Sequence, residues 1–512
     1  MGNRNMYNKY VIPIIFLRTA DPRPKCAEHI VQFTEQIKLR NKYNLPFNCL
    51  MTYDAMENEE MITLVKENKN DLTECGIWFE LCGELVRKAG IQWRGKEEWE
   101  WIVNPGFLMA YTCDEKKRII DIVMDKYFSL FNEYPRTVAS WLLDSWSMEY
   151  ITEKYSPDAF VICREQWAMD AYTLWGGPYY GGYYPSKNNA LVPSQNKEKQ
   201  IGTPVFRMYV NDPIYCYYEH ERKKYNKIDY HLFTQEPAWM CGQTPKWIKW
   251  HYDTIFNNNS SGFMYTQLGQ ENGFMWIDKL DNALKYQYEF AYDNKDDYGF
   301  EYITFGEMGK RFKLLYKTTP MTCVYALSDW AENGNKSVWF NSKYYRINIF
   351  SDDKKVWIRD LQKYDDNQRD VYLDSPCQDS LGVYEALPVM DGVQFSDDEV
   401  QAGIYFGEGT ISSVSKEDSH TVVEISIDDK KIKLFLKEDL IEVVCDSPVN
   451  ADFVYMNNCD VIKEISDKEI NYKHRNGEEY RITFKQGFIM GNKIFSDKNK
   501  IIINLSYPVR SH

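Results

Sequence analysis

The strongest constraint in this sequence is a regular alternation between two kinds of segment over residues 1–318. Short apolar runs alternate with longer stretches in which apolar residues recur every three or four positions. This pattern is typical of βα units, in which a helix follows each strand and the strands join one parallel sheet. We therefore predict an α/β fold with a TIM-like (β/α) barrel, of eight or seven strands, over residues 1–318.

Eight segments fit the strands of such a barrel: 11–18, 47–54, 76–81, 138–144, 160–165, 205–210, 231–236 and 262–267. The helical pattern is clearest at 26–43, 59–68, 115–131, 147–155, 245–256 and 276–292. Two long insertions, 89–111 and 166–202, fall on the strand-to-helix side of the pattern. Barrel enzymes build their active sites on that side, so we expect both insertions near the site.

The pattern changes after about residue 320. Short β-branched and aromatic runs follow one another, separated by polar turns. The turn sequence Asp-Asp-Lys-Lys occurs twice between such runs, at 352–355 and 428–431, as hairpins would require. We predict a second domain over residues 319–512, all-β and built as a sandwich.

Composition excludes several classes of partner. The formal net charge is −14, and no long basic run is present, which argues against nucleic acid and anionic membranes. The apolar run 11–17 is too short to span a bilayer and is followed by charges. The 12 cysteines are scattered singly with no CxxC pair, which favours a reduced, cytoplasmic protein.

Aromatic residues make up 16% of the chain, more than a core of this size needs. Flat rings can stack on the C–H face of a pyranose, so the excess favours a saccharide as the partner. The tyrosine- and glycine-rich segment 166–202 fits one wall of a sugar subsite, with Tyr172 and Trp175 as stacking faces. The alternative is that these rings pack the insertion onto the rest of the protein.

Carboxylates fall at or just after six of the predicted strands: Asp54, Glu80, Asp144, Asp212, Glu236 and Glu271. In a barrel these ends meet at one mouth. A ring of acids repels itself unless it serves a metal, a cationic substrate, or the acid and base of glycoside cleavage. Any single acid alone would more simply be solvated or paired with a cation such as Arg207.

Other chemistries have little support. The histidines are His29, His220, His231, His251, His420, His474 and His512, and no HxxxH or HExxH occurs. A zinc site is therefore not expected, whereas an all-carboxylate Ca²⁺ or Mg²⁺ site stays open. The sequence also lacks GxSxG, Walker and dinucleotide motifs, so we predict no cofactor.

Five motifs carry a family resemblance: ECGIWFE (74–80), AGIQW (89–93), PRTVASWLLD (135–144), DAYTLWGG (170–177) and QLGQEN (267–272). They resemble a family of gut-bacterial proteins assigned as glycoside hydrolases, in which an N-terminal barrel precedes a C-terminal β domain, both catalogued as domains of unknown function. The chain also looks distantly like polysaccharide deacetylases and glycoside hydrolase family 57.

The two distant resemblances imply different site residues. In the deacetylases the metal-binding acid would map to Asp54, but the histidine pair expected near Trp78 and Cys82 is missing. The family 57 comparison implies Asp144 or Glu236 as a catalytic carboxylate.

We predict a glycoside hydrolase with Glu236 and Glu271 as the catalytic pair and Asp144 as the substitute for either. Substrate-binding roles are predicted for these residues: Glu80, Asp170, Asp212, Trp141, Tyr172, Trp175 and Arg207. The alternatives are a metal-dependent hydrolase like the carbohydrate deacetylases and a non-catalytic saccharide-binding protein. The sequence is compatible with a homo-oligomer.

Overall fold

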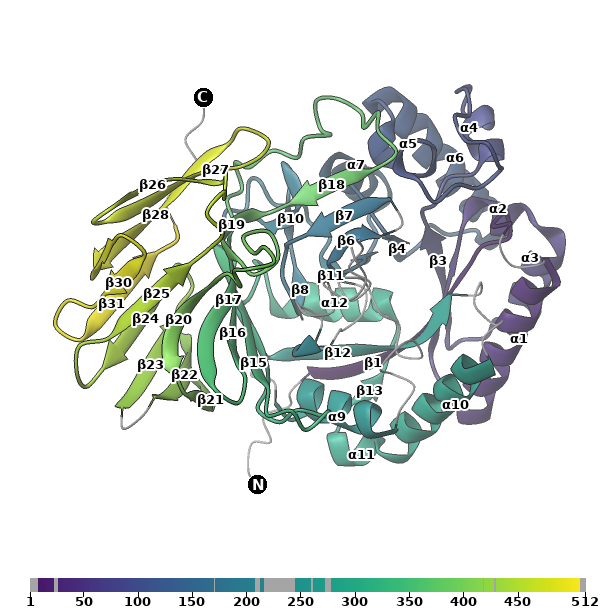
Figure 1. Ribbon diagram of the computed structural model, residues 1–512. Helices are drawn as coiled ribbons and strands as arrows, with labels where there is room; N and C mark the ends of the chain where they lie inside the picture. Colours follow the sequence, from purple (N-terminus) through teal and green to yellow (C-terminus); the bar gives the residue numbers. More distant parts are fainter. Residues whose placement is uncertain are drawn as a thin grey trace.

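The computed structural model of this chain describes residues 8–22, 26–169, 171–207, 212–215, 245–258, 261–271, 278–417, 419–427 and 430–506. Helices lie among the strands as far as α12, and in the described part beyond it only strands follow (Figure 1). The structure is therefore a mixed α/β half followed by a β half.

Seven parallel strands form the sheet of the α/β half. They are β1 (Asn8–Leu17), β2 (Phe47–Met51), β3 (Thr73–Trp78), β4 (Thr137–Ser140), β5 (Ala159–Ile162), β11 (Val205–Arg207) and β12 (Phe263–Glu271). Their order is β12-β1-β2-β3-β4-β5-β11, with the short β8 (Gly182–Tyr183) antiparallel to β11 and β13 (Glu301–Tyr302) paired with β1. Seven of the eight predicted strands are thus confirmed. The eighth, 231–236, lies outside the described residues, so closure of this barrel-like sheet stays a prediction.

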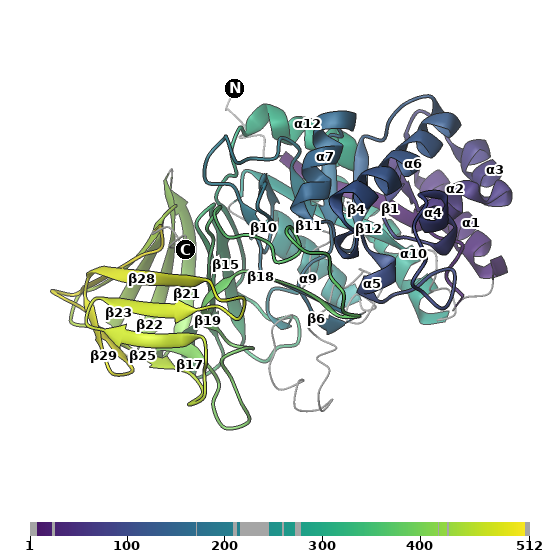
Figure 2. The same ribbon diagram turned by 90° about the horizontal axis from the view of Figure 1, so that it is seen from above.

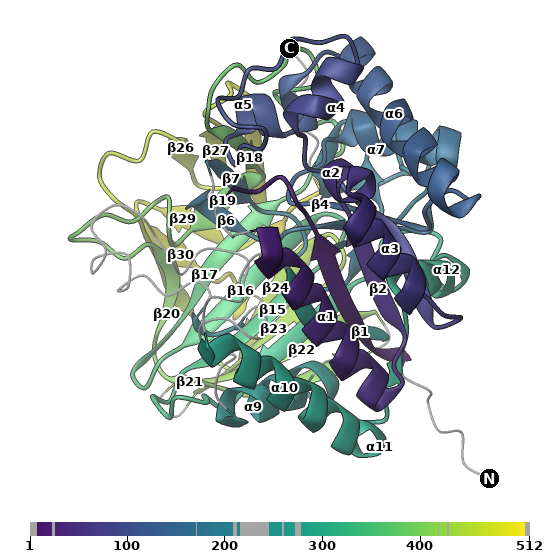
Figure 3. The same ribbon diagram turned by 90° about the vertical axis from the view of Figure 1, so that its right-hand side faces the viewer.

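Helices connect the strands and cover the outer side of the sheet, as Figure 3 shows for α1, α3 and α10. The helices are α1 (Cys26–Tyr43), α2 (Tyr53–Glu57), α3 (Glu59–Asn68), α4 (Gly83–Lys88), α5 (Val103–Gly106), η1 (Leu108–Ala110), α6 (Cys113–Phe131), α7 (Ser145–Tyr155), α9 (Pro245–Phe256), α10 (Asp278–Asp293), α11 (Lys295–Tyr298) and α12 (Phe305–Leu315). The predicted bounds of α1, α3 and α9 are confirmed.

Capping explains where two helices begin earlier than predicted. Thr112 and Glu115 form a capping box, so α6 begins at Cys113. Asp144 caps α7, and its side chain accepts a hydrogen bond from the backbone N–H of Ser147. The predicted strand 138–144 was too long for this reason, since Asp144 already belongs to the helix start and β4 ends at Ser140.

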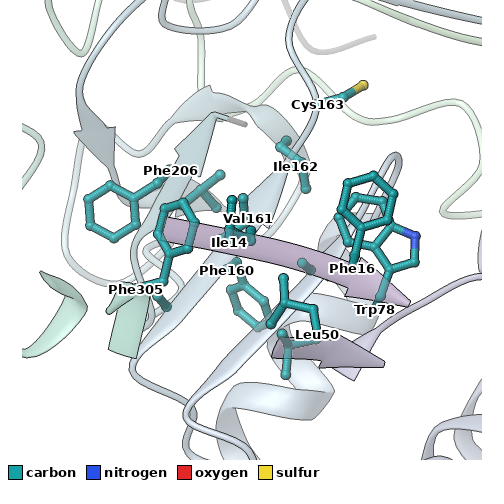
Figure 4. Packing of buried hydrophobic residues seen from close by; sticks show 14 of the residues in the cluster. Ile14, Phe16, Leu50, Trp78, Phe160, Val161, Ile162, Cys163, Phe206 and Phe305 are labelled. Carbon is teal, nitrogen blue, oxygen red and sulfur yellow. The ribbon is translucent and has the colours of Figure 1, made fainter. Parts of the chain in front are cut away.

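Large apolar side chains fill the space inside the parallel sheet (Figure 4). Phe16 and Trp78 stack with ring centroids 4.2 Å apart, and Trp141 packs edge-on against both rings. Gly269 lets β12 approach β1 closely, because a Cβ there would lie 1.9 Å from the Ile14 carbonyl oxygen. The apolar runs of the sequence thus become the interior that fixes the strand ends.

Two antiparallel sheets make up most of the β half, beside the α/β half in Figures 1 and 2. One contains β14 (Thr322–Ala326), β15 (Lys336–Asn341), β16 (Tyr345–Ser351), β17 (Lys355–Lys363), β19 (Leu387–Asp391), β20 (Gly403–Glu408), β25 (Asn450–Val454), β29 (Phe488–Met490) and β30 (Lys493–Phe495). The other contains β21 (Thr410–Glu417), β22 (His420–Ile427), β23 (Lys430–Leu436), β24 (Leu440–Cys445), β26 (Ile462–Ser466), β27 (Glu469–Lys473), β28 (Glu479–Gln486) and β31 (Lys500–Asn504). Side chains of both sheets share one apolar core.

A segment of the β half reaches back over the α/β half. We call residues 364–386, between β17 and β19, the strap. Its strand β18 (Gly382–Glu385) pairs in parallel with β7 (Tyr172–Trp175), which also pairs with β6 (Gln166–Met169). Insertion 166–202 contributes β9 (Pro185–Ser186) and β10 (Asn189–Pro193) as well. The domain boundary predicted after residue 318 falls between α12 and β14 and stays a prediction, since the strap crosses it.

Candidate active site at the strand ends

Four acids lie just beyond the carboxyl ends of four consecutive strands. Asp54 follows β2, Glu80 follows β3, Asp144 follows β4 and Glu165 follows β5. These strands are parallel neighbours, so their carboxyl ends share one edge of the sheet, which we call the mouth. Barrel enzymes place their chemistry at this edge.

Glu80 is the most heavily bonded of the four acids. Its carboxylate accepts two hydrogen bonds from Arg18, at 2.6 and 3.0 Å. It also accepts the indole N–H groups of Trp78, Trp99 and Trp141 at 2.9, 2.8 and 2.6 Å. Both oxygens are therefore committed, and Glu80 is only 4% exposed. The geometry suits a residue that positions rings at the mouth better than one that binds a sugar hydroxyl.

Asp54 differs from the other three acids in having one oxygen without a partner among the described residues. Its Oδ2 accepts hydrogen bonds from the backbone N–H groups of Thr19 and Ala20, at 2.6 and 2.7 Å, and from the Thr19 hydroxyl at 3.1 Å. Its Oδ1 is buried and accepts no hydrogen bond from any residue in the described ranges. A carboxylate held at one oxygen and open at the other can take a ligand or a proton.

His29 lies near this acid, at the start of α1. Burial lowers its pKa, while its hydrogen bond to the Asp21 carbonyl and the charge of Asp21 oppose that shift. Its Nδ1 is buried without a partner among the described residues. Sequence reasoning gave His29 no role, since it stands alone in a polar helix start. Within the described ranges, no three His, Cys, Asp or Glu side chains form a set that could hold a metal ion.

Asp144, the predicted substitute for a catalytic acid, is 1% exposed and fully engaged. It forms an ion pair with Lys116 at 3.0 Å, and both its oxygens bond to Ser147. These contacts make it a helix cap and the counter-charge of a buried lysine.

Asp370 of the strap joins this buried pair. It is 3% exposed, and its carboxylate accepts the backbone N–H of Tyr372 at 2.8 Å. Burial, helped by the nearby charge of Asp144, raises the pKa of Asp370 to about 7 against the opposing effects of Tyr372, Tyr384 and Lys116. Two carboxyl groups thus face one lysine. Sequence reasoning missed Asp370 because no local pattern links it to Asp144.

Glu165 belongs to a second buried charge network. Burial alone would raise its pKa, but Arg164, Arg207 and Arg346 outweigh that effect and hold the pKa at about 2. Arg346, from β16, also bonds both oxygens of Asp360 at 2.9 Å. Burial raises the pKa of Asp360 to about 6 although Arg346 opposes this. This network ties the mouth to the β half.

Arg207, predicted to bind substrate, uses its guanidinium within the protein. It donates to the carbonyl oxygens of Cys163 and Gly176, each at 2.7 Å, and is 2% exposed. These bonds hold insertion 166–202, which we call the aromatic insertion, against the end of β5.

The aromatic insertion packs onto the β half. The Trp175 indole donates to Asp391 at 2.6 Å, and Tyr179 stacks on Trp339 with centroids 4.0 Å apart. Tyr172 and Trp175 are each 1% exposed, so protein atoms cover both rings in this structure. The packing interpretation of this segment fits these contacts, and a stacking role for the two rings stays a prediction.

Of the remaining predicted residues, the structure describes Asp212 and the backbone of Glu271. Asp212 is buried and accepts the backbone N–H groups of Ile214 and Tyr215 and the indole N–H groups of Trp247 and Trp330. Glu271 ends β12 opposite Phe16 of β1, which brings its backbone to the mouth. Asp170, Glu236 and the side chain of Glu271 lie outside the described residues.

A cavity of about 210 Å³ lies at the opposite, amino-terminal edge of the sheet. Its lining includes Glu74, Arg136 and Thr304. Glu74 accepts hydrogen bonds from Asn48, Thr137, Thr304 and Gly306. This edge of a barrel usually serves stability, and the dense bonding around Glu74 agrees with that role.

No protein-family model matches the sequence, and no curated protein is significantly similar to it. Among solved structures, a "putative glycoside hydrolase/deacetylase" from Parabacteroides distasonis aligns with a TM-score of 0.52 at 14% identity, covering 77% of this chain and 96% of that one. This likeness shows a shared fold. No helix in the described part of the chain is long and apolar enough to cross a membrane.

Two further solved structures align with TM-scores of 0.36. They are a "putative polysaccharide deacetylase" from Mycobacterium smegmatis, at 11% identity over 61% of this chain and 93% of that one, and a "probable Polysaccharide deacetylase" from Pseudomonas aeruginosa PAO1, at 9% identity over 59% and 90%.

Proposed function

We propose that this chain is a carbohydrate-processing hydrolase that cleaves a glycosidic bond at the mouth with a pair of carboxyl groups. The supporting observation is that consecutive strands deliver acids to one edge, and that Asp54 alone of the four keeps an oxygen without a partner among the described residues. The excess of aromatic residues and the fold shared with the P. distasonis protein support a saccharide substrate.

Glu236 and Glu271 remain the proposed catalytic pair, and we add Asp54 as a third proposed acid of the site. One carboxyl group protonates the leaving oxygen, and the other attacks the anomeric carbon or activates water. A separation of about 5 Å would give retention of configuration, and about 6.5–9.5 Å would give inversion. Asp144 becomes a positioning residue in this scheme, because Lys116 and Ser147 occupy its oxygens.

The second candidate is hydrolysis of an ester or amide on a saccharide, helped by a divalent cation. The observation that favours it is the same unpartnered oxygen of Asp54, because hard cations prefer carboxylate ligands. Against it, the described residues supply no set of three ligands.

The test is to incubate the purified chain with aryl glycosides, with oligosaccharides and with their acetylated forms. Release of reducing ends from unacetylated oligosaccharides, unaffected by EDTA, is the expected result. Release of acetate that EDTA abolishes would replace the glycosidase with the deacetylase. Saccharide binding without any product would reduce the protein to a binding module.

A further inference from the structure

The insertion 89–111 carries three tryptophans, of which Trp99 bonds to an acid of the mouth and Trp101 is exposed. Trp99 donates its indole N–H to Glu80 at 2.8 Å and is 5% exposed. Two residues further along, Trp101 is 48% exposed. Trp141 also bonds to Glu80 and is only partly buried. Glu80 thus holds Trp99 and Trp141 at the mouth. Trp99 lies in the same segment as the exposed Trp101.

Trp101 is one of several exposed aromatic side chains of this half, along with Phe128, Tyr134 and Tyr292. Those three rings contact other rings, whereas Trp101 forms no hydrogen bond or ring contact with any residue that the structure describes. An exposed tryptophan ring keeps apolar area that a ligand can remove from water. Its flat face is also free to stack on a bound ring.

The backbone below Trp101 is held firmly. The N–H of Val103 donates to the Ser380 carbonyl of the strap at 3.0 Å, and the N–H of Cys377 donates to the Met109 carbonyl at 2.9 Å. Leu381, next to Ser380, is 43% exposed. A stacking ring on an anchored segment loses little conformational freedom when it binds a ligand.

We propose that Trp101 is the stacking platform of an outer saccharide subsite, which takes a sugar unit of a chain whose cleaved bond lies at the mouth. The proposal rests on the proposed function for its ligand class and predicts that the substrate is an oligosaccharide of several units. A sugar chain is the occupant that the proposed function implies, and Trp101 lies two residues after Trp99, which bonds to Glu80 at the mouth. A pyranose stacks its C–H face on an indole ring, and its hydroxyls remain in water.

The experiment measures binding apart from catalysis. Isothermal titration compares the wild-type chain with Trp101→Ala, using cellohexaose, xylohexaose, maltohexaose and chitohexaose, and then the matching monosaccharide of whichever hexaose binds. We expect a three- to tenfold loss of hexaose affinity in Trp101→Ala, the amount that one aromatic contact supplies. Monosaccharide affinity should be unchanged, and Trp101→Tyr should recover most of the loss.

Tyr292→Ala is the matched control. Tyr292 is 50% exposed on α10, which Figures 1 and 3 place away from α5 and the insertion. Equal hexaose affinity in the wild type and Trp101→Ala, or an equal loss in Tyr292→Ala, would overturn the subsite, as would a wild type that binds none of the four. If hexaose binding depends on Trp101 but the wild type hydrolyses no hexaose, the subsite is supported and only the proposed function is rejected.

Discussion

The indole N–H of Trp175 donates to the carboxylate of Asp391 at 2.6 Å, joining two buried side chains 216 residues apart. Trp175 belongs to β7 of the aromatic insertion, and Asp391 ends β19 of the β half. Together with the pairing of β7 and β18, this bond makes the insertion and the β half one packed unit.

Trp175→Phe should destabilise the protein by about 1–3 kcal/mol, because a buried carboxylate loses a donor while most of the ring volume stays. Denaturant unfolding measures the change in the free energy of unfolding. Trp101→Phe is the control, because an exposed ring away from buried bonds should change the free energy by less than about 0.5 kcal/mol. Equal effects of the two substitutions would contradict the account of the junction.

Glu80→Gln should cost about 1–3 kcal/mol, because the buried Arg18 loses its closer carboxylate partner and keeps Asp21, at 3.5 Å. The matched control is Glu98→Gln in the neighbouring insertion, where the exposed pair with Arg87 spans 2.6 Å. Exposed pairs contribute less than about 1 kcal/mol, so this variant should unfold close to the wild type. A Glu80→Gln protein as stable as Glu98→Gln would show that the indole and guanidinium bonds do not hold the mouth together.

Asp370→Asn should flatten the dependence of stability on pH. The folded pKa of Asp370 is about 7, against about 3.9 for an unfolded aspartate, so the folded state binds the extra proton between those pH values. The wild-type free energy of unfolding should therefore fall as pH rises from about 4 to 7.

Asparagine cannot titrate, so the variant should be the more stable protein at pH 8 and should lose that advantage by about pH 4. Asp360 contributes a slope of the same sign below about pH 6 and remains in both proteins, so the difference between them isolates Asp370. Parallel curves of melting temperature against pH for the two proteins would refute the shared-charge account of Asp144 and Asp370.

Asp54→Asn should lower kcat/KM at least about 100-fold while leaving the fold intact. The amide oxygen can keep the hydrogen bonds from Thr19 and Ala20, and the amide nitrogen takes the place of the oxygen that has no described partner. Asp144→Asn should instead cost mainly stability, about 1–3 kcal/mol, because the buried Lys116 loses its ion-pair partner at 3.0 Å and keeps the charge of Asp370. Turnover of Asp54→Asn within twofold of the wild type would remove Asp54 from the site.

Local sequence patterns predicted much of the fold. The apolar runs that became β1, β2 and β5 and the periodic stretches that became α1 and α9 carry their structure in neighbouring residues. The same holds for acids that follow strands, since strand direction alone places them at the mouth.

The partners of those acids could not be predicted, because they come from distant elements. Arg346 of β16 reaches Glu165, and Asp370 of the strap comes near Asp144. The pairing of β18 with β7 has no local signal either. Whether the oxygens of an acid have hydrogen-bond or ion-pair partners therefore depends on the tertiary structure. From the sequence, Asp144 is a catalytic candidate, whereas Asp54 is only one of six strand-end acids and the position compared with the deacetylases.

The central claim is tested most directly by kcat/KM of the wild type, Glu236→Gln and Glu271→Gln on one saccharide that the wild type hydrolyses. Both carboxamide variants should lose at least about two orders of magnitude, since neither can supply a proton or a nucleophilic carboxylate. Their melting temperatures should match the wild type. Turnover that survives either substitution unchanged would contradict the proposed carboxylate pair.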